Sequence, residues 1–210
     1  MSPEEIEAYF TRNDRTFAFS RWGRPIAPIV FGVEDETIRT VKAAVDSVTA
    51  LANHTLSETD SELGSNLMFF FFRDWEELRY VPKLDQIVPK LGPLTVKLEQ
   101  EQANQYRFFR FDKFGGIKAC FIFVRMDEHL NAVSAEILSL SQVVQSILLW
   151  SDVAFKEKSP LALLPKGETI LRPEIAQLIR AAYDPVLAVY SDQSSHALRL
   201  FARMQRQLKV

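Results

Sequence analysis

Four polar residues interrupt an apolar segment in the second half of the chain. In the sequence SLSQVVQSILLWSD, Ser141, Gln142 and Gln145 occupy positions i, i+1 and i+4, and Asp152 ends the segment. On a helix, side chains at i and i+4 lie on one face. With two histidines and a glutamate at these positions, the same spacing holds a zinc ion beside a general base. Serine and glutamine are poor zinc ligands, so the spacing occurs here without its chemistry.

The same four residues are candidates for a vestigial site, in which we expect no catalytic and no metal-binding residue. If the cleft of such a site persists, Gln142 and Gln145 should point into it beside Asp152. Ser141 can bond back to a carbonyl one turn earlier, whereas Gln145 needs a partner on another segment or in a cleft. An alternative role for Asp152 is that of a cap or turn residue after the helix.

The remaining residues with metal-binding or nucleophilic side chains form no recognisable pattern. His54, His129 and His196 form no ligand-like pattern with another histidine or acid, apart from Glu128 next to His129. We therefore expect surface or capping roles for the histidines and no cofactor. Cys120 is the single cysteine, which excludes an intramolecular disulfide, and its apolar surroundings predict a buried strand thiol.

Other catalytic motifs are missing or incomplete. The chain has no G-x-S-x-G nucleophile elbow, and KFGGIK lacks the Lys-Ser or Lys-Thr of a phosphate-binding loop. Asp74, Glu76 and Glu77 lie beside Arg73 and Arg79 in a group typical of a solvated turn. If the protein is an enzyme nevertheless, the alternative to a non-catalytic domain is a hydrolase of unrecognised type, whose acidic residues come together only in the folded protein.

Composition and charge narrow the classes of partner. The formal net charge is −2, whereas nucleic-acid binding needs a concentrated basic face. With 47% hydrophobic residues, sixteen Phe and only seven Gly, the sequence predicts a well-filled interior. Its 210 residues favour one domain, with an N-terminal helical extension (1–20), a sheet-rich part (21–126) and a helical part (127–210). Two small domains are the alternative.

The sequence also bears on membrane association and compartment. No apolar run approaches the roughly 20 residues that cross a bilayer, so we expect no transmembrane segment. The start MSPEEIEAYF is acidic and does not resemble a signal peptide. We therefore expect a cytoplasmic protein for the chain as given, or a periplasmic or secreted one if a leader was removed.

Apolar runs bounded by turn residues predict a sheet. The strand candidates are Ile29–Val33, the run SNLMFFFF from Ser65, and the two arms around Gly115-Gly116. The Phe-rich run is apolar at every position, which predicts burial on both faces.

Helical spacing of apolar residues predicts the other elements. A first helix follows Ser2, a second follows a cap at Asp35, and a central one covers Leu130 to Trp150. Short helical turns are expected over Asp74–Gly92 and an irregular stretch over Ser151–Gly167. One C-terminal helix begins at Pro173, and the last begins near Ser194 with Leu200, Phe201, Met204 and Leu208 inward. The order of elements indicates an α+β fold with a mixed sheet packed on the central helix.

Five stretches in a set order carry a resemblance to a known family. They are RWGRPI from Arg21, SNL from Ser65, SQVVQSILLWSD from Ser141, SPLALL from Ser159 and LRPEIAQLIRAAYDP from Leu171. Together they resemble a bacterial family, the domain of unknown function 2927, over most of Arg21 to Met204. That family looks like a zincin fold without a complete metal site, and most members are secreted. The resemblance implies the fold far more than an activity.

The chain departs from that family at three positions. Leu148 stands where the family has glycine, and Ser141 and Gln142 stand where it has acids. The sequence thus favours a non-catalytic zincin-like domain that acts by binding, and the expected partner is another protein. It does not specify an oligomeric state.

Overall fold

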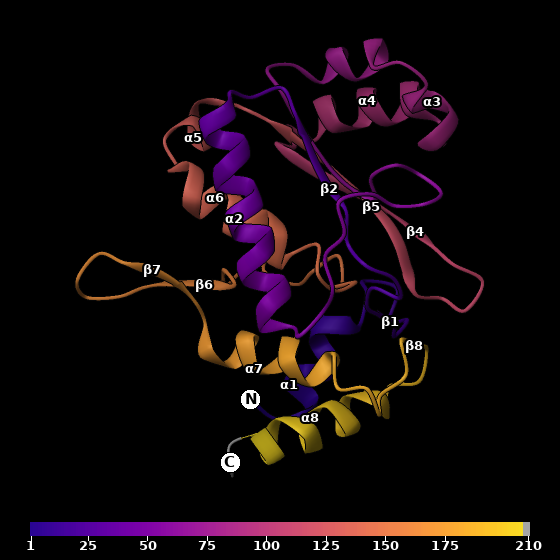
Figure 1. Cartoon of the computed structure of the whole chain (residues 1–210), viewed down its shortest axis with the longest axis vertical. Helices are drawn as coiled ribbons and strands as arrows, with labels where there is room; N and C mark the ends of the chain where they lie inside the picture. Colours follow the sequence, from indigo (N-terminus) through magenta and orange to yellow (C-terminus); the bar gives the residue numbers. More distant parts are fainter. Residues whose placement is uncertain (208–210) are drawn as a thin grey trace.

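Four strands form the mixed sheet at the centre of the computed structural model, which describes residues 1–207. Strands β2 (Pro28–Phe31), β3 (Leu67–Phe72) and β5 (Ile117–Arg125) run parallel, and β4 (Gln105–Phe111) pairs antiparallel with β5. The order β2-β3-β5-β4 leaves β4 at one edge of the sheet (Figure 1). All the predicted strand segments therefore meet in one sheet, and the α+β class is confirmed.

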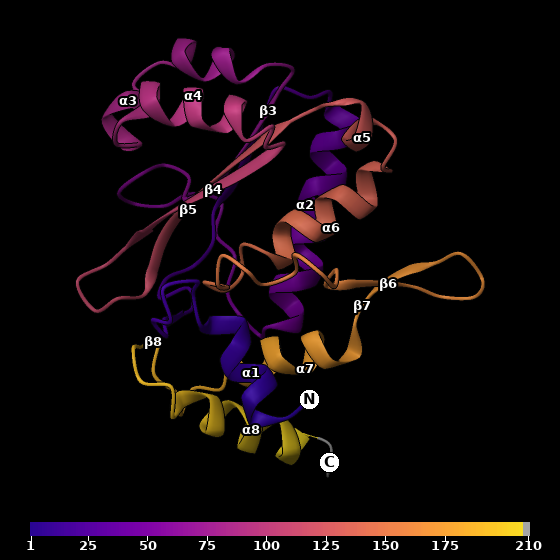
Figure 2. The ribbon, with the colours of Figure 1, turned by 180° about the vertical axis from the view of Figure 1, so that it is seen from behind.

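Strand β3 is buried on both faces, as its apolar run predicts. Phe69 and Phe71 pack into one apolar cluster with helices α2 (Asp35–Leu51) and α6 (Ala135–Val144). Phe70 and Phe72 face the opposite way, into a second cluster. That face is covered by η1 (Trp75–Tyr80), α3 (Leu84–Ile87) and α4 (Leu91–Gln100), as Figures 1 and 2 show. The predicted turns over Asp74–Gly92 are found, whereas α4 was not predicted.

The two ends of the chain pack together beyond one end of the sheet. Helix α1 (Pro3–Phe10), capped by Ser2, lies against α8 (His196–Gln207), and α7 (Pro173–Ala182) packs on α8 (Figure 2). In α8, Leu200 and Met204 are buried and Phe201 is half-buried, while Leu208 lies outside the described residues. A short pair of strands, β1 (Phe19–Ser20) and β8 (Tyr190–Ser191), joins the same region.

Two smaller sequence predictions are wrong. Helix α2 has Glu34 at its N-cap, so Asp35 is its first residue rather than the cap. The stretch Ser151–Gly167 is not wholly irregular, because β6 (Leu161–Leu163) pairs with β7 (Thr169–Leu171) in a projecting hairpin (Figure 1). The hairpin turn contains Gly167 at φ +86°, a conformation that glycine adopts without strain.

The predicted central helix over Leu130 to Trp150 is also wrong in its extent. The structure divides it into α5 (Glu128–Asn131) and α6, which ends at Val144 with Gln145 as its C-cap. The apolar residues that follow remain buried in an irregular segment, so helical spacing was a misleading guide there.

Side chains from distant segments explain why the helix stops. The Nε1 of Trp22 donates to the carbonyl of Ser146 at 2.9 Å, and the hydroxyl of Tyr183 donates to the carbonyl of Ile147 at 2.8 Å. These carbonyls would otherwise accept from amides further along a helix. Tertiary hydrogen bonds replace the helical ones, so the carbonyls of Ser146 and Ile147 keep partners although the helix has ended.

Candidate binding cleft

A cleft of about 1080 Å³ runs along strand β4, on the side of the sheet that carries α6. One wall is formed by residues 105–109 of β4 and by Phe111. Residues 12–14, Ser151, Asp152 and residues 154–156 also line the cleft, as do Gln145, Leu149 and Trp150. Consecutive residues of β4 line the wall, which is expected where the edge of a strand, rather than one face, borders a cavity.

The backbone of β4 presents unpaired groups at this edge. Arg125 N donates to Asn104 O at 2.8 Å, and the register then places Gln105, Arg107 and Phe109 opposite residues with which they exchange no ladder hydrogen bonds. Their N–H and C=O groups therefore point away from β5, and none bonds to another part of residues 1–207. The side chains of these three residues lie on the face toward α6, since Phe109 packs on that face.

Arg107 is a half-buried cation at the wall of the cleft. Its Nη2 donates to the Oε1 of Gln105 at 2.9 Å and to the Oε1 of Gln142 at 2.6 Å, and its buried Nε has no partner. Burial lowers the pKa of the guanidinium to about 10. Within residues 1–207 no carboxylate forms an ion pair with it. Sequence analysis missed this residue.

The three polar residues of the central segment take different roles. Gln145 Nε2 donates to Ser141 Oγ at 3.0 Å, so positions i and i+4 do share a face. Gln142 is only 1% exposed, and its Nε2 donates to Gln105 Oε1 at 2.9 Å. Gln145 lines the main cleft, whereas Ser141 and Gln142 line a separate cavity of about 390 Å³.

Two expectations about this trio are therefore wrong. Gln142 does not point into the cleft with Gln145, because it is drawn to the strand by Arg107 and Gln105. Gln145 does line the cleft together with Asp152, but it was wrongly expected to lack a local partner, because the hydroxyl of Ser141 one turn earlier accepts its proton.

Asp152 borders the cleft as a tie between two loops. Its carboxylate accepts from the backbone N of Asn13 at 3.0 Å and from Asn13 Nδ2 at 2.8 Å. The neighbouring Ser151 N donates to Tyr9 O at 2.8 Å, so these three bonds hold the segment after Trp150 to the N-terminal part of the chain. Asp152 lies in a turn after the helical segment, but its side chain bonds to the distant Asn13 rather than capping α6 or that turn.

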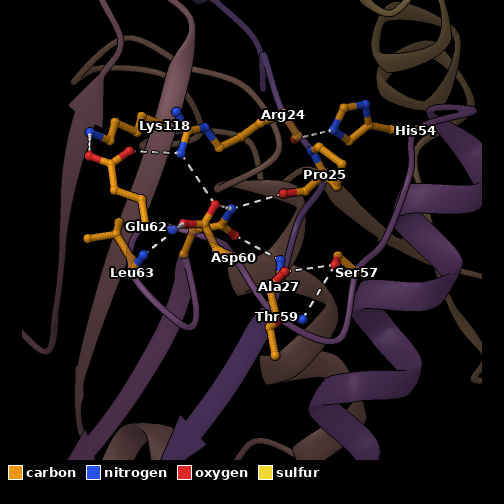
Figure 3. Close-up of polar contacts among 11 residues, drawn as sticks. Arg24, Pro25, Ala27, His54, Ser57, Thr59, Asp60, Glu62, Leu63 and Lys118 are labelled. Carbon is orange, nitrogen blue, oxygen red and sulfur yellow. Dashed lines mark hydrogen bonds and ion pairs between the residues drawn. The ribbon is translucent and has the colours of Figure 1, made fainter.

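A second polar cluster lies at the start of β3 and β5 and holds the loop before β3 in place (Figure 3). Asp60 accepts from the backbone N of Glu62 and of Leu63, both at 2.9 Å, and from Arg24 Nη1 at 3.3 Å. Glu62 pairs with Lys118 and Arg24, and these partners lower the pKa of its carboxyl. The pair of Glu62 and Lys118 thereby holds this loop against the start of β5.

Asn66 joins this cluster to the entry of β2. Its Oδ1 accepts from Ala27 N at 2.8 Å, and its Nδ2 donates to Pro25 O at 2.9 Å and to Asp60 Oδ2 at 3.1 Å. The stretches SNL and RWGRPI, far apart in the sequence, are thus bound to each other. Both polar atoms of the Asn66 side chain are thus satisfied within the fold.

The stretches RWGRPI and LRPEIAQLIRAAYDP also meet in the interior. The hydroxyl of Tyr183 accepts from Trp22 N at 3.3 Å, and the guanidinium of Arg21 lies 5.4 Å from the centre of the Tyr183 ring. Burial raises the pKa of Tyr183. Together with the bond to Ile147, these contacts give the Arg-Trp and Tyr-Asp-Pro stretches a role in holding the segment after α6.

The histidines and the cysteine lie apart from the cleft. His129 is exposed, and His54 Nε2 lies 2.8 Å from Arg24 O. The surface role expected for His196 is wrong, since it is 2% exposed and its ring centre lies 4.3 Å from that of Phe19. Burial and the nearby Arg199 lower its pKa to about 4. Cys120 is buried in β5, as predicted, and burial raises the pKa of its thiol.

Three further findings complete the description of the chain. Among residues 1–207, no three His, Cys, Asp or Glu side chains are grouped so as to hold a metal ion. None of the helices described is both long enough and apolar enough to cross a membrane. No family model, curated protein or solved structure matches the chain.

Proposed function

We propose that the chain is a non-catalytic zincin-like domain that binds an extended segment of another protein in the cleft along β4. The observation that carries this proposal is the free edge of β4, whose outward N–H and C=O groups border a cleft deep enough to hold a polypeptide. An extended peptide can add to such an edge as a further strand, with main-chain hydrogen bonds supplying affinity.

The free edge of β4 is seven residues long, and it carries an inward-facing charge, Arg107, and a bulge between Arg110 and Phe111. Natural proteins protect edge strands with charges, prolines or covering segments, since unpaired edges invite unwanted pairing. In β4 the outward positions alternate with Tyr106 and Phe108, which pack with the second apolar cluster. The strand thus combines a rigid apolar anchor with open backbone groups, and the cleft leaves room for one more strand.

The acids of the cleft support binding over hydrolysis. Asp152 is held by Asn13, and Asp14 accepts from Thr16 N at 2.9 Å and from Thr16 Oγ1 at 2.6 Å. Both carboxylates stabilise their own loops. General acid–base hydrolysis by two carboxyls needs groups free to face the substrate.

A substitution on the free edge tests the proposal. The N–H of Phe109 points away from β5, so Phe109→Pro removes an outward donor without removing a ladder bond. The matched control Phe109→Ala removes the ring but keeps the donor. Both proteins, with the wild type, would be screened against a phage-displayed library of random peptides, and enriched peptides would be synthesised for affinity measurements.

We expect the screen to yield enriched peptides. Their affinity for Phe109→Pro should be at least about tenfold lower than for the wild type, because one or two main-chain hydrogen bonds are lost. Their affinity for Phe109→Ala should fall by less. Urea unfolding of each variant checks that both remain folded. Peptides that bind Phe109→Pro as well as they bind the wild type, or a library without any enriched peptide, would overturn the proposal.

A further inference from the structure

The cleft holds a charge that the described residues do not neutralise. Removing a guanidinium from water is costly unless a carboxylate or several good acceptors replace the water. Arg107 has only two amide oxygens, both bonded to the same Nη2, while its Nε is buried without a partner. Such a half-satisfied cation lies beside a cavity from which a ligand can reach it.

The rest of the lining strengthens the positive character of the site. Arg12 and Lys156 also line the cleft, and neither takes part in an ion pair within residues 1–207. The two acids of the lining, Asp14 and Asp152, are each engaged by neighbouring donors. The cations of the cleft therefore lack partners while its anions have them, which favours an anionic ligand group.

We infer that Arg107 receives the carboxylate of an aspartate or glutamate side chain carried by the segment that pairs with β4. This inference rests on the proposed function, and it names the chemistry of the bound segment. An arginine fork binds a carboxylate through two parallel hydrogen bonds, which suits a guanidinium that has donors to spare.

The register of the edge specifies a second feature of the ligand. In an added strand, the residue opposite Arg107 places its side chain on the same face, and so does the residue two positions along, opposite Phe109. Phe109 packs on the apolar cluster of that face and offers an aromatic surface. The bound segment should therefore carry an acidic residue and an apolar one two positions apart, the residue between them facing the other way.

Peptides selected in the library screen provide the probes. An enriched peptide of about six residues would be made with acetylated and amidated ends, so that its only carboxylate is a side chain. A second version would replace that acidic residue by its amide. Fluorescence anisotropy would measure both affinities for the wild type, for Arg107→Gln and for Arg110→Gln. Arg110 is an exposed arginine on the same strand, and its side chain alternates to the other face.

We expect the acidic peptide to bind the wild type at least about tenfold more tightly than its amide, as charge-assisted hydrogen bonds predict. The preference should disappear in Arg107→Gln and persist in Arg110→Gln. If urea unfolding shows that Arg107→Gln does not fold, Arg107→Lys replaces it, and the preference should then shrink because an ammonium lacks the planar fork.

The outcomes separate the two proposals. Enriched peptides without acidic residues, or equal affinities of the acidic and amide peptides for the wild type, overturn the role of Arg107. Strand addition still stands in that case if Phe109→Pro abolishes binding of both. A preference that persists in Arg107→Gln also overturns the inference, because the carboxylate then binds elsewhere. Binding that is insensitive to Phe109→Pro removes the proposed function itself.

Discussion

Substituting leucine for Gln142 should destabilise the protein much more than the same change at Gln145. The two glutamines lie on the same turn and differ little in sequence context, but the structure gives them different partners. Gln142 accepts from Arg107 Nη2 at 2.6 Å and donates to Gln105 Oε1 at 2.9 Å, while being 1% exposed. Gln145 is half-buried at the cleft and bonds only to Ser141 Oγ, at 3.0 Å.

The expected magnitudes follow from these contacts. A hydrogen bond to a charged group contributes about 1.5–3 kcal/mol, and a neutral one about 0.5–1.5 kcal/mol. Gln142→Leu removes one of each and leaves Arg107 with one acceptor, partly offset by the burial of an apolar side chain. We expect a loss of about 2–4 kcal/mol. For Gln145→Leu the loss should be no more than about 1 kcal/mol, because Gln145 is only half-buried and the hydroxyl of Ser141 can bond to water in the smaller cavity that it lines.

Urea unfolding followed by circular dichroism measures both losses, provided that the slope of free energy against urea is unchanged. The reasoning is refuted if the two variants lose equal stability, or if Gln142→Leu costs less than about 1 kcal/mol. A loss of about 2–3 kcal/mol for Gln145→Leu would mean that its environment is closed, and the cleft would no longer be a candidate binding site.

Two further predictions concern the interior. Tyr183→Phe removes the hydroxyl that bonds to Ile147 O and Trp22 N, so it should cost about 1–3 kcal/mol in urea unfolding, whereas Tyr190→Phe at a more exposed ring should cost almost nothing. His196 has a folded pKa of about 4 against 6.5 for the free side chain, so the unfolded state binds more protons between these values. Stability should therefore fall by about 3 kcal/mol as the pH drops through that window, and His196→Phe should remove this part of the pH dependence of the unfolding midpoint.

The sheet could be predicted because its signals are local. The run Leu67–Phe72 is apolar at every position, and Gly115-Gly116 separates two strand-like arms. Burial on both faces then follows from the absence of polar alternation. The end of α6 could not be predicted, since Trp22 and Tyr183 satisfy the carbonyls after Val144 from positions far away in the sequence. Helical spacing continues through Ile147–Trp150, so no local signal marks the change.

The cleft was predicted only in part, for a similar reason. The spacing of Ser141 and Gln145 does place them on one face, because that depends on helix geometry alone. The direction of Gln142 depends on which strand lies beside the helix, which the sequence does not state. A weak signal for Arg107 was present in QYRFFRF, where alternation puts Gln105, Arg107 and Phe109 on one face. A charged residue on the same face as a core phenylalanine needs an explanation, and the edge position of β4 provides it.

The helix and the strand together suggest how a site of this shape can recognise a carboxylate without a metal. In the zinc-binding arrangement, the helix supplies ligands to a cation that the site must acquire. Here the strand supplies the cation itself, as Arg107, and the helix supplies a neutral oxygen from Gln142 that orients it. A histidine or an acid at position 142 would change this balance, since an acid would neutralise the guanidinium and a histidine could not accept from it in the same way. Because position 142 carries a neutral glutamine rather than an acid, Arg107 has no carboxylate partner within residues 1–207, which is the condition that the proposed binding of an acidic side chain requires.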